Sequence, residues 1–336
     1  MNAAAILAIP LTDPERLFTA PGTVKDEFRD LSKQWHPDMH GGESEVFAHI
    51  VILRDVALEK VTKGEWHTPG MLDLSTPKKD YRIRYQKKHT TETGELYIAK
   101  TIVAHALRTD FADLVFNAEK IIKGFKFASR GMEKEVSRYL PAPKASFEAS
   151  GRRFMVMQKT EDLILLKDLL EHVGGTLDPK HVAWVVSSLL NLACYFEYAG
   201  IVHNAIGLDT YYVSPEHHSG VLLGGWWYAC KVGSKMVALP PRTARLMPVD
   251  VLAKKKADPR TDLALIRATA IDLLGGSSWA SLDKNAPAPM AKWLKYPSSG
   301  SAVEDYRRWM DVLKDSFGPR RFTELKIKAS DIYRKD

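Results

Sequence analysis

Apolar residues recur at three- and four-residue spacing in two stretches near the start of the chain, at positions 24–35 and 46–61. This spacing predicts two amphipathic helices. Proline at position 37 ends the first helix, and the pair Gly41-Gly42 separates it from the second. The sequence Asp13-Pro14 predicts the start of another short helix. Residues 1–67 are therefore expected to form a helical domain in which two helices flank a short loop.

The pattern changes after this domain. Residues 68–80 contain prolines and paired lysines without a sustained period, so we expect a linker there. Apolar and polar residues alternate at 81–85 and again at 96–99, around a turn at 90–94. This alternation predicts a β-hairpin. A mostly helical segment is expected to follow, up to residue 140.

A second pair of strands is expected at 145–149 and 153–157, on either side of the turn Ser150-Gly151. From residue 165 onward the apolar positions have a helical period, and the clearest helix is expected at 179–199. Strands followed by a helical half indicate an α+β fold.

Composition and charge indicate a soluble protein of more than one domain. The chain has 336 residues, of which 45% are hydrophobic and 26% charged, and a net charge of +7 that favours acidic partners. The two cysteines, Cys194 and Cys230, cannot build a disulfide framework or a four-cysteine zinc site. The apolar start lacks a basic segment, and no apolar run approaches the ~20 residues needed to cross a bilayer. We therefore expect a cytoplasmic protein with no metal site and no membrane partner.

The tripeptide His36-Pro37-Asp38 lies between the first two predicted helices, and three cations follow one face of the helix before it. This arrangement resembles a J domain. The resemblance implies that the loop and the positive stripe bind a DnaK-type chaperone and stimulate its ATPase. A solvated charged face is the alternative, because acidic residues share the same helix. The side chains expected to bind the chaperone are His36, Pro37, Asp38, Lys25, Arg29 and Lys33.

Residues 81–325 resemble a protein kinase, in the order of several short segments. Tyr97-Ile98-Ala99-Lys100 is similar to the strand that carries the ATP-anchoring lysine, and Glu135 lies in a segment similar to the helix whose glutamate pairs with that lysine. Glu119 is a competing partner, and the alternative to a Lys100–Glu135 pair is that both residues are surface charges. The segment ending at His203 is similar to the helix that enters the catalytic loop, and Asp262 falls where kinases bury a structural aspartate.

The departures from the kinase pattern indicate an inactive domain. Phosphoryl transfer needs an aspartate to orient the substrate hydroxyl, together with an asparagine and a second aspartate to hold magnesium. Ala205 and Thr210 occupy the first two of these positions, and the stretch around Gly225 has no carboxylate for the third. The resemblance therefore implies a pseudokinase without a cofactor. Asp209 is expected to form a turn, with a shifted catalytic role as the alternative.

Three further groups have competing interpretations. His203 is expected to be a core histidine that supports the loop backbone rather than a base. The aromatic residues around Trp226 and Trp227 are expected to fill the former cleft, with a peptide-binding groove as the alternative. Lys254-Lys255-Lys256 and Arg320-Arg321 are expected to be solvated loops, with weak nucleic-acid binding as the alternative.

The two resemblances together predict a helical domain at 1–67, a linker at 68–80, a β-rich small lobe at 81–158, a larger helical lobe at 159–325 and a basic tail at 326–336. The function they predict is that of a co-chaperone, in which the kinase-like domain binds an unidentified protein client. The alternatives are an active atypical phosphotransferase and a basic scaffold that binds nucleic acid.

Overall fold

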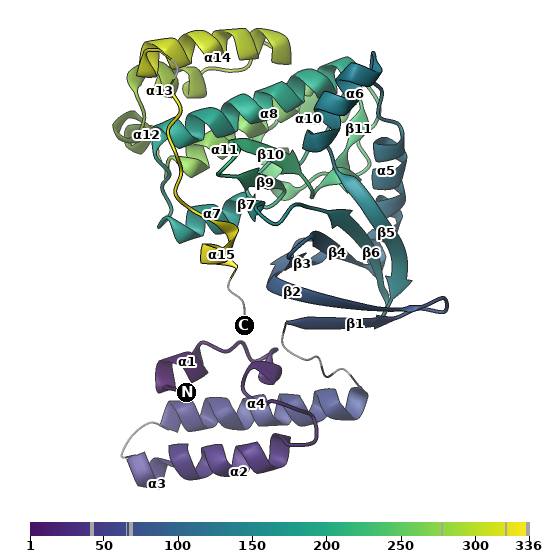
Figure 1. Cartoon of the computed structure of the whole chain (residues 1–336), viewed down its shortest axis with the longest axis vertical. Helices are drawn as coiled ribbons and strands as arrows, with labels where there is room; N and C mark the ends of the chain where they lie inside the picture. Colours follow the sequence, from purple (N-terminus) through teal and green to yellow (C-terminus); the bar gives the residue numbers. More distant parts are fainter. Residues whose placement is uncertain (41–43, 65, 67–69, 277, 320, 334–336) are drawn as a thin grey trace. The chain divides into compact units, whose positions relative to one another are not determined.

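The computed structural model describes residues 1–336 except 41–43, 65, 67–69, 277, 320 and 334–336. The chain forms two compact units, residues 1–85 and 86–336 (Figure 1). The predicted break at Gly41-Gly42, the first residues of the predicted linker and the last residues of the predicted tail lie outside the described residues. The α+β fold predicted from the sequence is confirmed: helices come first, then an antiparallel sheet, then a largely helical region.

The first unit is built on two helices that run side by side in opposite directions, as predicted (Figure 1). Their apolar faces enclose a small core that includes Ile50 and Leu53, both 0% exposed. The predicted helix start at Asp13-Pro14 is a single 3-10 turn, and a short helix precedes it. The helical elements are α1 (Ala3–Leu7), η1 (Pro14–Arg16), α2 (Val24–Trp35), α3 (Pro37–His40) and α4 (Ser44–Lys63).

A strand lies where the sequence predicted only a linker. Strand β1 (Met71–Ser75) pairs antiparallel with β2 (Asp80–Thr91), with Leu72 opposite Ile83. Leu72 and Leu74 are buried, because they alternate with polar residues and face the same side of the strand. The linker prediction is therefore wrong for these residues.

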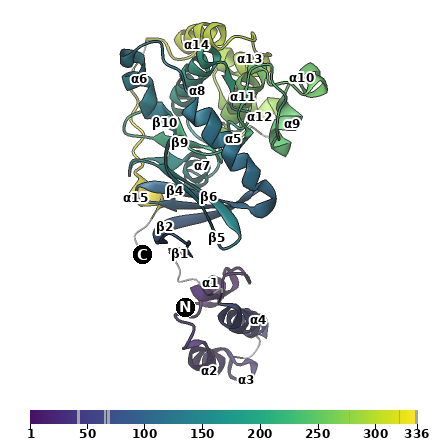
Figure 2. The same ribbon diagram turned by 90° about the vertical axis from the view of Figure 1, so that its right-hand side faces the viewer.

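The sheet has six strands in the order β1-β2-β3-β4-β6-β5. The predicted hairpin and the second strand pair are confirmed. A strand, β4, stands at the beginning of the segment predicted to be mostly helical, and two helices follow it, of which α5 packs beside the sheet (Figure 2). These elements are β3 (Gly94–Ala99), β4 (Ile102–Arg108), α5 (Ala112–Lys123), α6 (Arg130–Val136), β5 (Ala142–Ala149) and β6 (Arg152–Gln158).

The helical region surrounds α8 (Pro179–Ala199), whose bounds match the prediction. The Asp178 side chain accepts a hydrogen bond from the Lys180 amide at its start, and Gly200 ends it with φ +68°. Within the described part of the chain, α8 is the one helix long and apolar enough to cross a bilayer, and 56% of its apolar window is buried in the unit.

Short elements and further helices pack around α8. The remaining strands are β7 (Ile164–Leu165), β8 (Ile201–Val202), β9 (Tyr211–Ser214), β10 (Ser219–Leu222) and β11 (Cys230–Lys231). The remaining helices are α7 (Leu166–His172), α9 (Pro241–Leu246), α10 (Val249–Lys254), α11 (Pro259–Leu273), α12 (Trp279–Asn285), α13 (Ala288–Lys295), α14 (Ala302–Phe317) and α15 (Ala329–Ile332), and the remaining 3-10 turns are η2 (Thr109–Phe111), η3 (Ser137–Tyr139) and η4 (Trp226–Tyr228).

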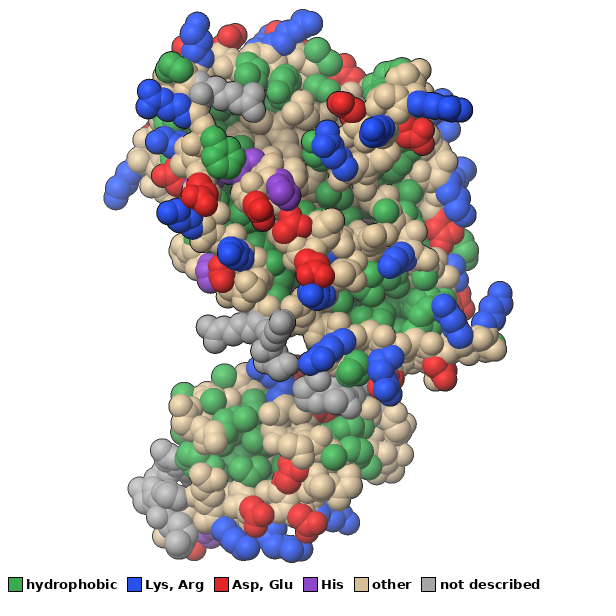
Figure 3. All heavy atoms as spheres, viewed as in Figure 1, with side chains coloured by type: hydrophobic (Ala, Val, Ile, Leu, Met, Phe, Trp, Pro, Cys, Tyr) green, Lys and Arg blue, Asp and Glu red, His purple; other side chains and the backbone are tan. Residues whose placement is uncertain are grey.

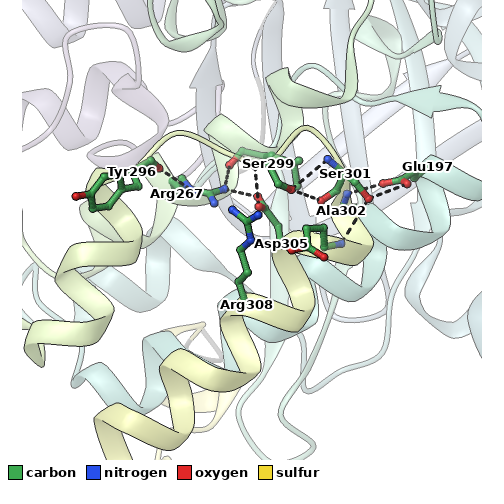
Figure 4. Close-up of polar contacts among 10 residues, drawn as sticks. Glu197, Arg267, Tyr296, Ser299, Ser301, Ala302, Asp305 and Arg308 are labelled. Carbon is green, nitrogen blue, oxygen red and sulfur yellow. Dashed lines mark hydrogen bonds and ion pairs between the residues drawn. The ribbon is translucent and has the colours of Figure 1, made fainter.

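A buried ion pair holds α14 against the rest of the helical region (Figure 4). Arg267 on α11 donates to Asp305 on α14 over 2.7 Å, and the two side chains are 7% and 1% exposed. The Arg267 guanidinium also donates to the carbonyl of Tyr296, while the Ser299 amide donates to Asp305. Glu197 on α8 accepts hydrogen bonds from the hydroxyl of Ser301, which caps α14, and from the amide of Ala302, its first residue.

The described residues of the predicted basic tail, 326–333, pack against the helical region through their apolar side chains. Tyr333 is 2% exposed, and its hydroxyl donates to Asp168 over 2.7 Å while accepting from the Leu165 amide over 2.9 Å. Lys87 and His89 on β2 also reach the Asp168 carboxylate, at 2.6 and 3.0 Å. Although residues 326–333 carry several charges, the buried Tyr333 side chain attaches them to α7, next to β2.

Candidate functional site

The loop between α2 and α4 holds its histidine and aspartate at the surface. His36 ends α2 in an extended conformation, and Pro37 begins α3. The side chains of His36 and Asp38 are 47% and 87% exposed. The Asp38 amide donates to His36 Nδ1 over 3.3 Å, and the imidazole ring lies edge-on to Phe47 of α4, with 5.4 Å between ring centroids. Both neighbouring elements therefore orient the imidazole, while solvent reaches it.

The positive stripe is also on the surface. Lys25, Arg29 and Lys33 lie on the outward face of α2, and Figure 3 shows Lys and Arg side chains gathered along this unit beside several acids. Arg29 and Lys33 pair with Asp26 and Asp30 at 3.5 and 3.4 Å, and all four side chains are at least 70% exposed. Such pairs contribute little to stability. The three cations are thus accessible to an acidic partner, although Asp26 and Asp30 reduce the net positive charge of this face.

In the second unit, the loop after β8 is built on a buried carboxylate. Asp262 is 3% exposed and accepts hydrogen bonds from the amides of His203 and Asn204, over 2.7 and 2.8 Å. Burial raises the pKa of Asp262 to about 7. Asp262 therefore organises the loop backbone, and the burial of this aspartate predicted from the sequence is confirmed.

His203 is a core residue, as predicted. Its ring is 0% exposed, lies edge-on to Trp226 with 4.7 Å between centroids, and accepts the Ala205 amide at Nδ1 over 3.3 Å. Burial lowers the pKa of His203 to about 3, so the imidazole stays neutral. A side chain enclosed in this way supports the loop and cannot reach a substrate.

Four of the residues that the kinase resemblance singled out converge in space. The Thr210 hydroxyl donates to the Ala205 carbonyl over 2.7 Å and so closes the loop on itself. Gly225 adopts φ +77°, and a Cβ added to it would lie 2.8 Å from the Ala205 Cβ and 2.9 Å from His203 Cε1. Glycine is required here by both conformation and space. The cluster formed by His203, Ala205, Thr210 and Gly225 is close-packed around this glycine.

Asp209 lies in a turn, as predicted, and faces away from this cluster. Its side chain is 68% exposed and its carboxylate lies 3.3 Å from the Lys167 ammonium. Among the residues that the structure describes, no group of three or more His, Cys, Asp or Glu side chains could hold a metal ion.

Lys100 and Glu135 are not part of the cluster. Lys100 lies in the turn between β3 and β4, and its ammonium is 3.0 Å from the Glu161 carboxylate, with both side chains more than half exposed. Glu135 lies on the exposed side of α6. Glu119, the competing partner, lies near Lys123 and Arg153. The predicted pairing of Lys100 with Glu135 is therefore wrong.

Two residues that the sequence did not single out contact the segment 223–229, which includes Gly225 of the cluster. His105 on β4 is fully enclosed, with Nε2 2.9 Å from the Leu223 carbonyl and its ring 5.0 Å from that of Trp227. Burial lowers the pKa of His105 to about 4. Asn117 on α5 donates to the carbonyls of Trp227 and Ala229 over 3.0 and 2.9 Å. A histidine inside an apolar run was the available signal for the first; nothing marked the second.

Aromatic side chains fill the space beside the cluster. Trp226 is 0% exposed, and its indole N–H donates to the Leu222 carbonyl over 2.8 Å. Phe125 and Phe196 lie edge-on to it, with 5.3 and 5.7 Å between ring centroids. Trp227, Tyr228, Tyr211 and Tyr212 are also buried. The predicted core-filling role of these aromatic residues is confirmed.

Sequence comparisons add no relative. No family model matches the chain, and no curated protein matches it at a significant level. The functional argument therefore depends on the residues and geometry described above.

Proposed function

We propose that this protein is a co-chaperone that stimulates the ATPase of a DnaK-type chaperone through His36, Pro37 and Asp38. The observation that carries the proposal is the exposed corner between α2 and α4, where His36 and Asp38 share a hydrogen-bonded loop and remain open to solvent. A partner must reach these side chains to respond to them, and a buried corner would have excluded this role.

In this proposal the positive stripe of α2 makes the first contact. Lys25, Arg29 and Lys33 attract an acidic surface of the chaperone and orient it, so that their main effect is on association. His36 and Asp38 then act on the chaperone, which hydrolyses its own ATP. The protein itself transfers no phosphoryl group.

The second unit is proposed to be a pseudokinase that holds a protein client. A kinase places a lysine on the strand before its first helix, a base in the catalytic loop and a magnesium-binding aspartate after the next hairpin. The corresponding positions here are His105, Ala205 and Gly225, and all three are buried. In this proposal His105 on β4, and not Lys100, stands where a kinase has its ATP-anchoring lysine. Tethering then raises the local concentration of client beside the chaperone.

The test is the steady-state ATPase rate of a DnaK-type chaperone with the full chain added. We expect stimulation by the natural protein and a return to the chaperone's basal rate with His36→Gln, because the imidazole is exposed and its loss leaves the core of the unit unchanged. His172→Gln, at an exposed position on α7, is the matched control and should stimulate normally. Full stimulation by the His36→Gln variant would contradict the proposed role of the corner.

A further inference from the structure

The outer surface of α9 and α10 carries aliphatic side chains that face solvent. Val249 is 83% exposed, and Leu246 and Leu252 are 38% and 39% exposed. Val237, 61% exposed, comes from the preceding loop, which is tied to α10 by a hydrogen bond from the Met236 amide to the Lys255 carbonyl. Figure 2 shows α9 and α10 together at the edge of the unit. Clustered exposed aliphatic residues mark interaction sites more often than single ones do.

A groove lies between α9 and α11, next to these side chains. Its volume is about 250 Å³. Pockets for drug-sized molecules span roughly 300–1,000 Å³, so this groove suits a single anchoring side chain better than a whole small molecule. It is lined by Arg242, Arg245, Leu246, Ala268, Ile271 and Asp272.

The charge of this region is positive because its own acids are already paired. Asp250 lies 2.8 Å from Arg260 and Asp272 is paired with Arg242. Arg245, Lys255 and Lys256 are exposed, and no carboxylate of the described residues lies within 4.0 Å of their charged groups. The aliphatic residues are thus bordered by cations that lack an internal partner.

We infer that this α9–α10 surface, formed by Val237, Arg245, Leu246, Val249, Leu252, Lys255 and Lys256, binds an acidic protein segment that carries aliphatic side chains. One aliphatic side chain enters the groove beside Leu246, others cover Val249 and Leu252, and the carboxylates meet the three cations. A nucleic acid fits less well, since single strands need aromatic stacking platforms and the exposed apolar residues here are aliphatic.

The inference deepens the proposed function, because it gives the class of client that the kinase-like unit holds. The test uses a short fluorescein-labelled peptide of alternating glutamate and leucine, added to the full chain and followed by fluorescence anisotropy. The anisotropy measurement contains no chaperone, and the chaperone ATPase assay contains no peptide. A negative anisotropy result therefore counts only against the α9–α10 surface, and a negative ATPase result counts only against the co-chaperone role.

We expect saturable binding that weakens about tenfold with Val249→Asp and with Arg245→Glu, as for central interface residues that cost more than 1 kcal/mol. Val303→Asp, at an exposed aliphatic position of α14, is the matched control and should bind as the natural protein does. Peptides with serine for leucine, or lysine for glutamate, should not bind. Equal binding of these peptides, unchanged affinity in both surface variants, or displacement of the peptide by single-stranded RNA would overturn the inference.

Discussion

Single residues in and around the loop after β8 are part of a core. His105 and His203 lie in apolar surroundings, each with one ring nitrogen near a backbone group, and both are held neutral by burial. Asp262 is enclosed as well, but it accepts two amide hydrogen bonds and keeps the loop in shape. These side chains stabilise a backbone conformation and are unavailable for acid–base chemistry on a substrate.

The burial of His105 predicts a pH dependence of stability. Its pKa falls from the ordinary value of 6.5 to about 4 on folding. Between these values the unfolded chain binds more protons than the folded chain, so the free energy of unfolding falls as the pH is lowered through this window. Replacing His105 with Gln, which can still donate to the Leu223 carbonyl, should remove about 2 kcal/mol of the stability loss between pH 7 and pH 5.

Urea denaturation of the second unit at the two pH values checks this result. His203 and Asp262 remain in both proteins, so their contributions cancel in the difference. His172→Gln, at an exposed position of α7, is the matched control. Identical pH dependence in the natural protein and in His105→Gln would mean that His105 is not held neutral by the fold.

For single residues, the sequence predicted burial and role where a local sequence pattern was available. The kinase resemblance identified His203 as a core residue and Asp262 as a buried aspartate, and both side chains are buried. Lys100 was predicted to end a strand beside the loop after β8, because it follows the apolar pair Ile98-Ala99. It lies instead in the exposed turn between β3 and β4. Asn117 could not have been found, since its role depends on α5 lying against η4.

Among the elements, those with a strong period were predicted and those without one were missed. Helices α2, α4 and α8 have long apolar faces, and their bounds follow the pattern closely. Strand β4 reads Ile102-Val103-Ala104-His105-Ala106-Leu107, a continuous apolar run that fits a buried strand or a buried helix equally well. Strand β1 is short and lies among prolines and glycines, so only its pairing with β2 identifies it.

The attachment of α14 predicts a large effect from one substitution. Asp305→Ala leaves the Arg267 guanidinium buried without its carboxylate, which should lower the free energy of unfolding by about 3–5 kcal/mol. Thermal and urea denaturation measure this change. Asp311→Ala on the exposed side of α14 is the control and should cost less than about 0.5 kcal/mol.

A double replacement separates the cost of an unpaired charge from the value of the ion pair. Arg267→Met combined with Asp305→Leu should recover most of the stability lost in Asp305→Ala, because hydrophobic residues can replace a buried ion pair at little cost. If the double variant is no more stable than Asp305→Ala, the hydrogen bonds to Tyr296 and Ser299 matter more than the charge.

For the whole molecule, the proposed division of labour predicts how the protein responds to nucleotide. No carboxylate lies in the cluster formed by His203, Ala205, Thr210 and Gly225 to hold magnesium, so ATP with magnesium should shift the melting temperature of the full chain by less than about 1 °C. Thermal-shift titration with and without the metal is the measurement. A metal-dependent stabilisation that grows with ATP concentration would favour the alternative of an active phosphotransferase.

The contact between Tyr333 and Asp168 has a consequence for synthesis on the ribosome. Lys87 and His89 are translated before Asp168 and can pair with its carboxylate as soon as it is synthesised. The Tyr333 hydroxyl, which donates a further hydrogen bond to this carboxylate, is translated some 165 residues later. Until then the Asp168 carboxylate and the Leu165 amide each lack the hydrogen bond that the Tyr333 hydroxyl supplies. The last contacts of the second unit therefore form late in synthesis. Chains that end before Tyr333 should be less compact and more sensitive to protease than the full chain.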